Sequence, residues 1–175
     1  MDAYQEFRRE KDAFMKRHAQ SPLSVAQKAA FTGLTYYPVD AALRFVVAPE
    51  EFAEKDVVTM QTNTGELRRY KRWGRVHFVV DGETASLTLF ETENGFFVPF
   101  TDATSGAETY GAGRYLEPIE ASDGRIVVDF NQAYNPYCVY SYQYSCPIPP
   151  AENRLEVAIR AGEKLPEGEW AGMME

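Results

Sequence analysis

The chain has 175 residues, of which 45% are hydrophobic and 25% charged, and its formal net charge is −8 at pH 7. This length is typical of one domain, and the negative charge argues against nucleic acid and anionic membranes as partners, because both need a basic surface. No apolar run reaches the roughly 18 residues of a membrane span, and the start MDAYQEFRREKDAF has no apolar signal segment. We therefore expect a cytoplasmic protein that does not bind membranes.

The first 32 residues indicate two helices. A helix over residues 2–18 would carry on one face, at three- and four-residue spacing, the side chains of Tyr4, Phe7, Lys11, Phe14, Met15 and His18. Ser21-Pro22 ends this helix. Ser24, with Gln27 three residues on, has the pattern of a capping box and predicts a second short helix that ends near Phe31.

From Tyr36 the apolar pattern alternates with period two, which is typical of strands. Strands are predicted over residues 42–47, 56–60, 66–73, 75–80, 83–90, 96–100, 113–120, 125–130 and 155–159. A two-residue turn at Asp81-Gly82 would pair Phe78 with Ala85 and Val76 with Leu87. Asn94-Gly95 predicts a second turn, with Leu89 opposite Phe100, and Ser122-Asp123-Gly124 a third.

Short strands separated by turns predict a mainly β fold, an antiparallel barrel-like meander with one or two N-terminal α-helices. We favour a closed sheet, because closure removes exposed strand edges. A single domain would span residues 1–175. Within it, the helical segment 1–32 would pack on the sheet, residues 36–161 would form the β domain, and residues 162–175 would form an acidic tail.

The segment RRYKRWGR (68–75) has five basic residues around Tyr70 and Trp73. Basic residues that alternate with aromatic ones can bind single-stranded nucleic acid. In an acidic protein, however, it favours a solvated edge strand that is protected by charge. We expect no nucleic-acid partner.

Histidines and cysteines limit the possible metal sites. The two histidines, His18 and His77, cannot build a three-histidine centre, and we expect no metal and no cofactor. Cys138 and Cys146 lack the spacing of zinc or CxxC redox motifs. A disulfide, a nucleophilic cysteine and two buried thiols remain open for them, with buried thiols favoured.

Three segments carry a family resemblance: TSGAETYGAGRYLEP (104–118), DFNQAYNPYCVYSYQYSCPIPPAENRL (129–155) and IRAGEK (159–164). Their patterns, TSGxxTYGxGRYL and DFNxAYNPYCxYxxxYSCPxPPxENRL, resemble an uncharacterised prokaryotic domain family, as does the N-terminal region. This resemblance implies a single domain and no particular activity.

Two features could contact a ligand. Gly-Ala-Gly before Arg114 could let an anion approach the backbone and the guanidinium, or it could be a turn entering a strand. Asp129 and Glu152 could approach each other if the chain between them folds back. A small hydrolase or lyase using Asp129 or Glu152 with Arg114 is therefore one hypothesis.

Residues 129–146 contain five of the tyrosines, and prolines follow them. Such a segment cannot pair in a sheet, so polar side chains must satisfy its backbone. It would cross one end of the barrel, where ligands enter. Our main hypothesis is a small-molecule-binding β-barrel with its site near residues 110–115 and 129–153; a protein-interaction module is a further alternative. The candidate ligand-binding residues are Arg114, Tyr115, Phe130, Asn131, Tyr134, Asn135, Tyr137, Tyr140, Glu152 and Asn153.

Overall fold

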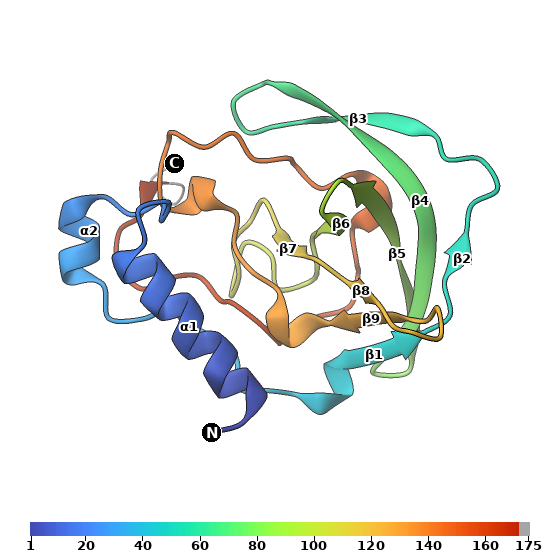
Figure 1. Cartoon of the computed structure of the whole chain (residues 1–175), viewed down its shortest axis with the longest axis horizontal. Coiled ribbons are helices and arrows are strands. Elements are labelled where there is room, and N and C mark those ends of the chain that lie inside the picture. The colour runs from blue at the N-terminus through green and yellow to red at the C-terminus, as the bar shows by residue number, and fades with distance from the viewer. Residues whose placement is uncertain (172–175) are drawn as a thin grey trace.

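Nine strands within residues 1–171, the part that the computed structural model describes, form two antiparallel sheets (Figure 1). The smaller sheet has the order β1–β9–β8. The larger has the order β2–β4–β5–β6–β7, and β3 also pairs with β4. The strands are β1 (Arg44–Val47), β2 (Glu50–Glu51), β3 (Val57–Gln61), β4 (Leu67–Val80), β5 (Glu83–Thr92), β6 (Gly95–Phe100), β7 (Arg114–Leu116), β8 (Ile119–Glu120) and β9 (Ile126–Asp129).

Two helices, α1 (Ala3–Arg17) and α2 (Val25–Ala30), precede the sheets. Each begins with a capping box, in which a cap side chain and a glutamine three residues on satisfy each other's backbone N–H groups. Both predicted helices, and the box at Ser24 and Gln27, are confirmed. Met15 is the buried anchor of α1, and it belongs to a cluster with Leu23, Phe31, Val139 and Tyr140.

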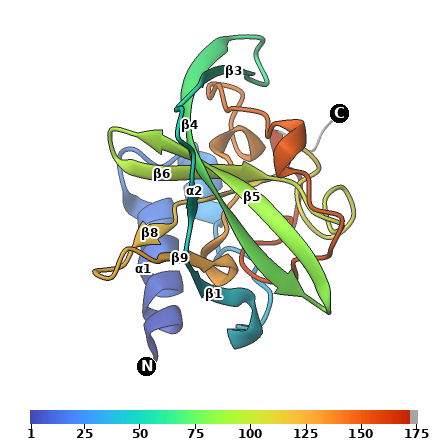
Figure 2. The ribbon, with the colours of Figure 1, turned by 90° about the vertical axis from the view of Figure 1, so that its right-hand side faces the viewer.

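The hairpin of β4 and β5 has the predicted register, with Phe78 opposite Ala85 and Val76 opposite Leu87. β4 is longer than predicted, because the segments 66–73 and 75–80 form one strand of 14 residues with an irregularity between Arg72 and Gly74. Figures 1 and 2 show this pair curving around the side of the molecule opposite α1. The curvature leaves room for the core inside the sheet.

The register predicted for the next hairpin is wrong by two residues. Phe90 pairs with Phe97 and Thr92 with Gly95, so Leu89 does not lie opposite Phe100. The turn residues are Glu93 and Asn94 rather than Asn94 and Gly95. The Thr92 hydroxyl fixes this turn, since it donates to the Gly95 carbonyl and accepts from the Asn94 N–H.

One other strand prediction is confirmed in part and one is corrected. In the basic segment, residues 67–71 of β4 pair with β3, whereas pairing with β5 begins only at Lys71, so residues 68–70 have a strand partner on one side only, as at a sheet edge. Residues 155–159 are not a strand. The Leu155 N–H donates to the Thr101 carbonyl, and the Ile159 N–H donates to the Asp102 carboxylate. Loop acceptors thus take the place of a neighbouring strand.

The two sheets share one hydrophobic core. Val76, Leu89 and Phe100 of the larger sheet and Ile126 and Val128 of the smaller one are fully buried in the same cluster. The fold is therefore mainly antiparallel β with N-terminal helices, as predicted. In the described residues the sheets surround the core in a barrel-like manner without closing into one sheet, since the chain leaves β7 at residues 117–118 to enter the smaller sheet.

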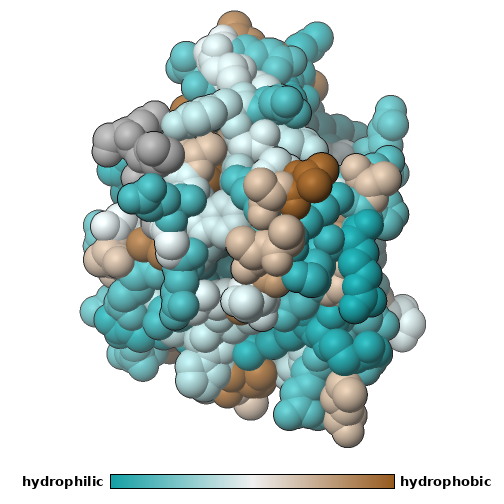
Figure 3. Space-filling model, turned by 90° about the vertical axis from the view of Figure 1, so that its left-hand side faces the viewer, coloured by the Kyte–Doolittle hydropathy of each residue, from teal (hydrophilic) through white to brown (hydrophobic). Residues whose placement is uncertain are grey.

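The helices, the C-terminal segment and the surface on the α1 side complete the description of the fold. No helix in residues 1–171 is long and apolar enough to cross a membrane. Of the predicted acidic tail, residues 162–171 pack on the domain, with Glu163 buried, and residues 172–175 lie outside the described part. The face on the α1 side is mostly hydrophilic, with small separate hydrophobic patches (Figure 3).

Candidate functional site

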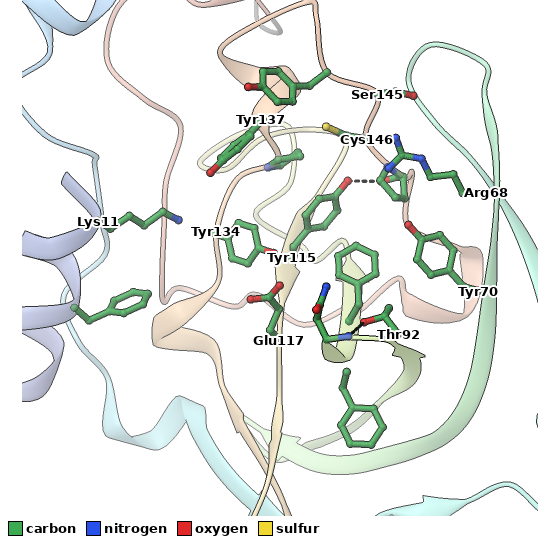
Figure 4. Close-up of a pocket in the computed structure, with 17 residues that line it drawn as sticks. Lys11, Arg68, Tyr70, Thr92, Tyr115, Glu117, Tyr134, Tyr137, Ser145 and Cys146 are labelled. Atoms are coloured by element: carbon green, nitrogen blue, oxygen red, sulfur yellow. Dashed lines mark hydrogen bonds between the residues drawn. The ribbon is translucent and has the colours of Figure 1, made fainter. Parts of the chain in front are cut away.

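A pocket of about 640 Å³ lies between α1, strands β4 to β7 and the segment that follows β9 (Figure 4). We call it the tyrosine pocket. Its volume is in the range of small-molecule sites. Its aromatic lining residues are Phe7, Tyr70, Phe96, Phe97, Tyr115, Tyr134, Tyr137 and Tyr144.

Tyr115 on β7 anchors one wall of the pocket. Its backbone exchanges two hydrogen bonds with Tyr134, with N···O distances of 2.9 and 3.0 Å. Its hydroxyl donates to the Pro147 carbonyl at 2.6 Å. The ring packs edge-on against Phe97 and Tyr134, with centroid separations of 4.9 and 5.8 Å. Three separate segments are thereby fixed around this ring, and the wall is preorganised.

Further aromatic pairs form the other walls. Tyr70 stacks on Phe97 with ring centroids 5.6 Å apart, and Tyr137 meets Tyr144 edge-on at 5.2 Å. Such edge-on and stacked pairs favour fixed ring orientations. Flat aromatic surfaces therefore face the pocket from several sides.

Three charged side chains line the pocket from different sides (Figure 4). Lys11 forms an ion pair with buried Glu163, and its ammonium lies 4.6 Å from the centroid of the Tyr134 ring. Arg68 and Glu117 are the other two. Burial and the Glu117 charge raise the pKa of Tyr134, so its phenol stays protonated. The pocket thus offers donors and acceptors around an aromatic interior.

Cys138 and Cys146 are free thiols, both buried in the cluster around Tyr115. The two buried thiols favoured from the sequence are therefore confirmed. The interaction between the two neighbouring thiols lowers the pKa of Cys146 to about 7 and, together with burial, raises the pKa of Cys138. Cys146 also lines the tyrosine pocket.

The structure separates the aromatic residues predicted to bind a ligand. Tyr115, Tyr134 and Tyr137 line the tyrosine pocket. Tyr140 is buried in the cluster beneath the helices, and Phe130 is fully buried in the main core. The predicted segment therefore contributes to both the pocket and the packing.

The three predicted asparagines are buried and bind the backbone. The Asn131 side chain accepts from the Asp40 N–H and donates to the Asp40 carbonyl, both at 2.9 Å. Asn153 makes the same reciprocal pair with Thr88, at 2.8 and 3.1 Å. Asn135 is also buried. These side chains satisfy backbone groups of other segments, whereas the prediction concerned the backbone of the proline-rich segment itself.

The Arg114 guanidinium faces the protein interior. Its side chain is 1% exposed, and it donates to the carbonyls of Ile159, Ala161 and Glu163. It also lies 3.4 Å from the Asp102 carboxylate. In this arrangement the arginine holds the segment 159–163 against the domain.

The predicted catalytic carboxylates have separate partners. Asp129 accepts a hydrogen bond from the Tyr4 hydroxyl at 2.7 Å. Glu152 forms a two-pronged ion pair with Arg72, at 2.7 and 3.1 Å. Neither hydrogen-bonds to Arg114, so the described contacts do not join the three groups into one site.

We expect Glu152→Gln to lower the free energy of unfolding by about 1 kcal/mol at pH 7. Burial alone would raise the pKa of Glu152, but hydrogen bonds from Arg72 and Thr88 outweigh it and hold the pKa below its ordinary value. The stabilisation is then present above the unfolded pKa of about 4.3 and is lost as pH falls through the lower folded value. Urea denaturation of both proteins at pH 7 and pH 3 measures this; an equal difference at both pH values would contradict it.

Sequence reasoning did not single out several pocket residues, among them Lys11, Arg68, Phe97 and Glu117. One signal was present for Glu117, because it lies two residues after Tyr115 and residues at that spacing share a strand face. The others come from elements distant in sequence, and only the fold brings them together.

The matches to known proteins described here carry no assigned activity. A family model described as "Protein of unknown function (DUF1684)" matches residues 29–164. The solution NMR structure of an uncharacterized protein of Haloarcula marismortui is 39% identical, covers 91% of each chain and has a TM-score of 0.69. A search of curated proteins finds no match.

Proposed function

Because the chain belongs to a family of unknown function, as its resemblance led us to expect, we propose a function from the site itself: the tyrosine pocket binds a flat, aromatic small molecule. The observation that carries this proposal is the lining of a pocket of about 640 Å³ by eight aromatic side chains. Rings that face a shared space favour a planar ligand, which they can stack on or meet edge-on.

The fixed positions of the rings support binding further. Tyr115, Tyr134 and Phe97 are fixed by backbone hydrogen bonds and by each other, so a ligand need not order them. Lys11 already has Glu163 as its counter-ion, which leaves shape rather than net charge to select the ligand. Arg68 and Glu117 would orient its polar substituents.

We also propose that the protein works in the cytoplasm and without nucleic acid. The net charge of −8 supports the absence of a phosphate-binding surface. Two free cysteines buried in one cluster support a reducing compartment.

A fragment comparison tests the ligand proposal. We expect indole and naphthalene fragments to shift the amide NMR signals of pocket residues, whereas saturated bicyclic fragments of equal size do so weakly. Tyr70→Ala and Tyr137→Ala should each weaken aromatic-fragment binding about 3- to 10-fold, because each removes one ring contact.

The matched control is Tyr142→Ala. Tyr142 belongs to the same tyrosine-rich segment but is 70% exposed and does not line the pocket. Its variant should bind like the wild type. Equal binding of saturated and aromatic fragments, or an equal loss in the Tyr142 variant, would refute the proposal.

A further inference from the structure

The two cysteines are far enough apart in sequence to form a loop, and the fold brings their thiols together. Cys138 lies in a short 3-10 turn (Tyr137–Val139), and Cys146 lies beyond the turn that follows it. The Cys146 backbone is fixed to Asn63 by two hydrogen bonds, at 2.7 and 3.1 Å. Both side chains are buried in the same small cluster beside Tyr115, and each thiol shifts the pKa of the other, so the two sulfurs are neighbours in the fold.

The surroundings of Cys146 favour its thiolate. The neighbouring Cys138 thiol, the backbone of Cys138 and Tyr137 and the Arg68 charge together lower the pKa of Cys146, although burial opposes them. Donors and cations of this kind increase the thiolate fraction, which is the reactive form. For Cys138 the neighbouring Cys146 thiol and burial raise the pKa and outweigh the contacts with the Tyr110 hydroxyl, at 3.9 Å, and with its own backbone.

Access also differs between the two thiols. Cys146 lines the tyrosine pocket, and Figure 4 shows its sulfur directed toward the space between Tyr115 and Tyr137. Cys138 lies behind it and is absent from the pocket lining. A small oxidant that enters the pocket therefore meets Cys146 first.

We propose that Cys146 and Cys138 form a peroxide-reactive dithiol, in which Cys146 is oxidised first and Cys138 then closes an intramolecular disulfide. The proposal concerns a modification site and does not depend on which ligand the pocket binds. The reaction needs a hydroperoxide as the oxidant, and a thiol reductant reverses it.

The chemistry proceeds in two steps. The Cys146 thiolate attacks one peroxide oxygen, so that an S–O bond forms, the O–O bond breaks and the leaving hydroxide takes a proton to become water. The Cys138 sulfur then attacks the Cys146 sulfenic acid; the S–S bond forms, the S–O bond breaks, and the Cys138 proton leaves with the hydroxide as a second water. Two thiols and one peroxide thus give one disulfide and two waters.

Mass spectrometry of the reduced full chain tests this directly, because the protein has only these two cysteines. Treatment with hydrogen peroxide should remove the mass of two hydrogen atoms, and peptide mapping should show a Cys138–Cys146 link that dithiothreitol reverses. A stable product that carries added oxygen on both cysteines, an intermolecular disulfide, or unchanged thiols would overturn the proposal.

Two variants separate the roles. In Cys138→Ser the reaction should stop at a Cys146 sulfenic acid, which dimedone traps. In Cys146→Ser, we expect oxidation of Cys138 to be about tenfold slower than that of Cys146 in the other variant, since Cys138 does not line the pocket and Arg68 does not lower its pKa. Circular dichroism checks that both variants fold. If one variant does not fold, the peptide map of the wild-type protein still tests the disulfide. Faster labelling of Cys138 than of Cys146 would refute the proposal that Cys146 is oxidised first.

Discussion

Replacing Arg114 with methionine is expected to lower the free energy of unfolding by about 3–5 kcal/mol. The substitution preserves much of the side-chain volume but leaves three backbone carbonyls, those of Ile159, Ala161 and Glu163, without their donor. It also leaves the buried Asp102 carboxylate without its positive partner. Uncompensated buried polar groups are among the costliest changes in a protein. Urea denaturation followed by circular dichroism measures the loss.

Arg125→Met is the matched control for Arg114→Met. Arg125 also pairs with an aspartate, Asp123 at 2.7 Å, but its side chain is 54% exposed. Solvent screens such a pair, and we expect a change below about 1 kcal/mol. A stable Arg114 variant that had lost affinity for a small anion would instead favour the anion contact considered from the sequence, and the structural role assigned to Arg114 would be wrong.

Local chemistry allowed much of the fold to be predicted. The capping residues Ser24 and Gln27 set a helix start, and Asp81-Gly82 set a hairpin register, because both act within a few residues. The Asn94-Gly95 turn was misplaced because the hydroxyl of Thr92 moved the turn by one residue. The residue types of the turn alone do not predict this effect of the Thr92 side chain.

The partners of strands were less predictable than the strands themselves. The basic residues of β4 were predicted to lie at an edge, and β3 pairs with one side of them while β5 pairs with β4 only from Lys71 onward. Residues 155–159 alternate like a strand, but Asp102 takes the N–H of Ile159. Pairing between segments that are tens of residues apart depends on where the connecting loops end. A period-two pattern predicts a strand but does not identify its partner.

The candidate site was predicted only in part, for a similar reason. The tyrosine-rich segment identified Tyr134 and Tyr137, because its unusual composition is visible in one stretch. Lys11 and Tyr70 reach the same pocket from a helix and a strand far away in the chain. Buried asparagines such as Asn153 looked like ligand contacts in the sequence, since backbone satisfaction and ligand binding use the same polar groups.

Gly113→Ala is expected to lower the free energy of unfolding by about 3–4 kcal/mol. Gly113 has φ of +105°, which costs an alanine roughly 1–2 kcal/mol by itself. A Cβ there would also lie 2.5 Å from the Phe100 carbonyl oxygen and 2.8 Å from Pro149. The backbone of β6 and the rigid proline ring cannot both move aside cheaply, so overpacking adds to the strain. Urea denaturation measures the sum.

Gly124→Ala separates the two contributions, because Gly124 has φ of +83° but no atom within 4 Å of the added Cβ. We expect it to cost only the backbone strain, about 1–2 kcal/mol. The excess for Gly113 then measures how tightly the chain before β7 packs against the end of β6. A packing role would explain the glycine before Arg114 without a ligand. If both variants lose the same stability, that close packing is not what requires the glycine, and backbone approach by a ligand becomes the better account of the motif.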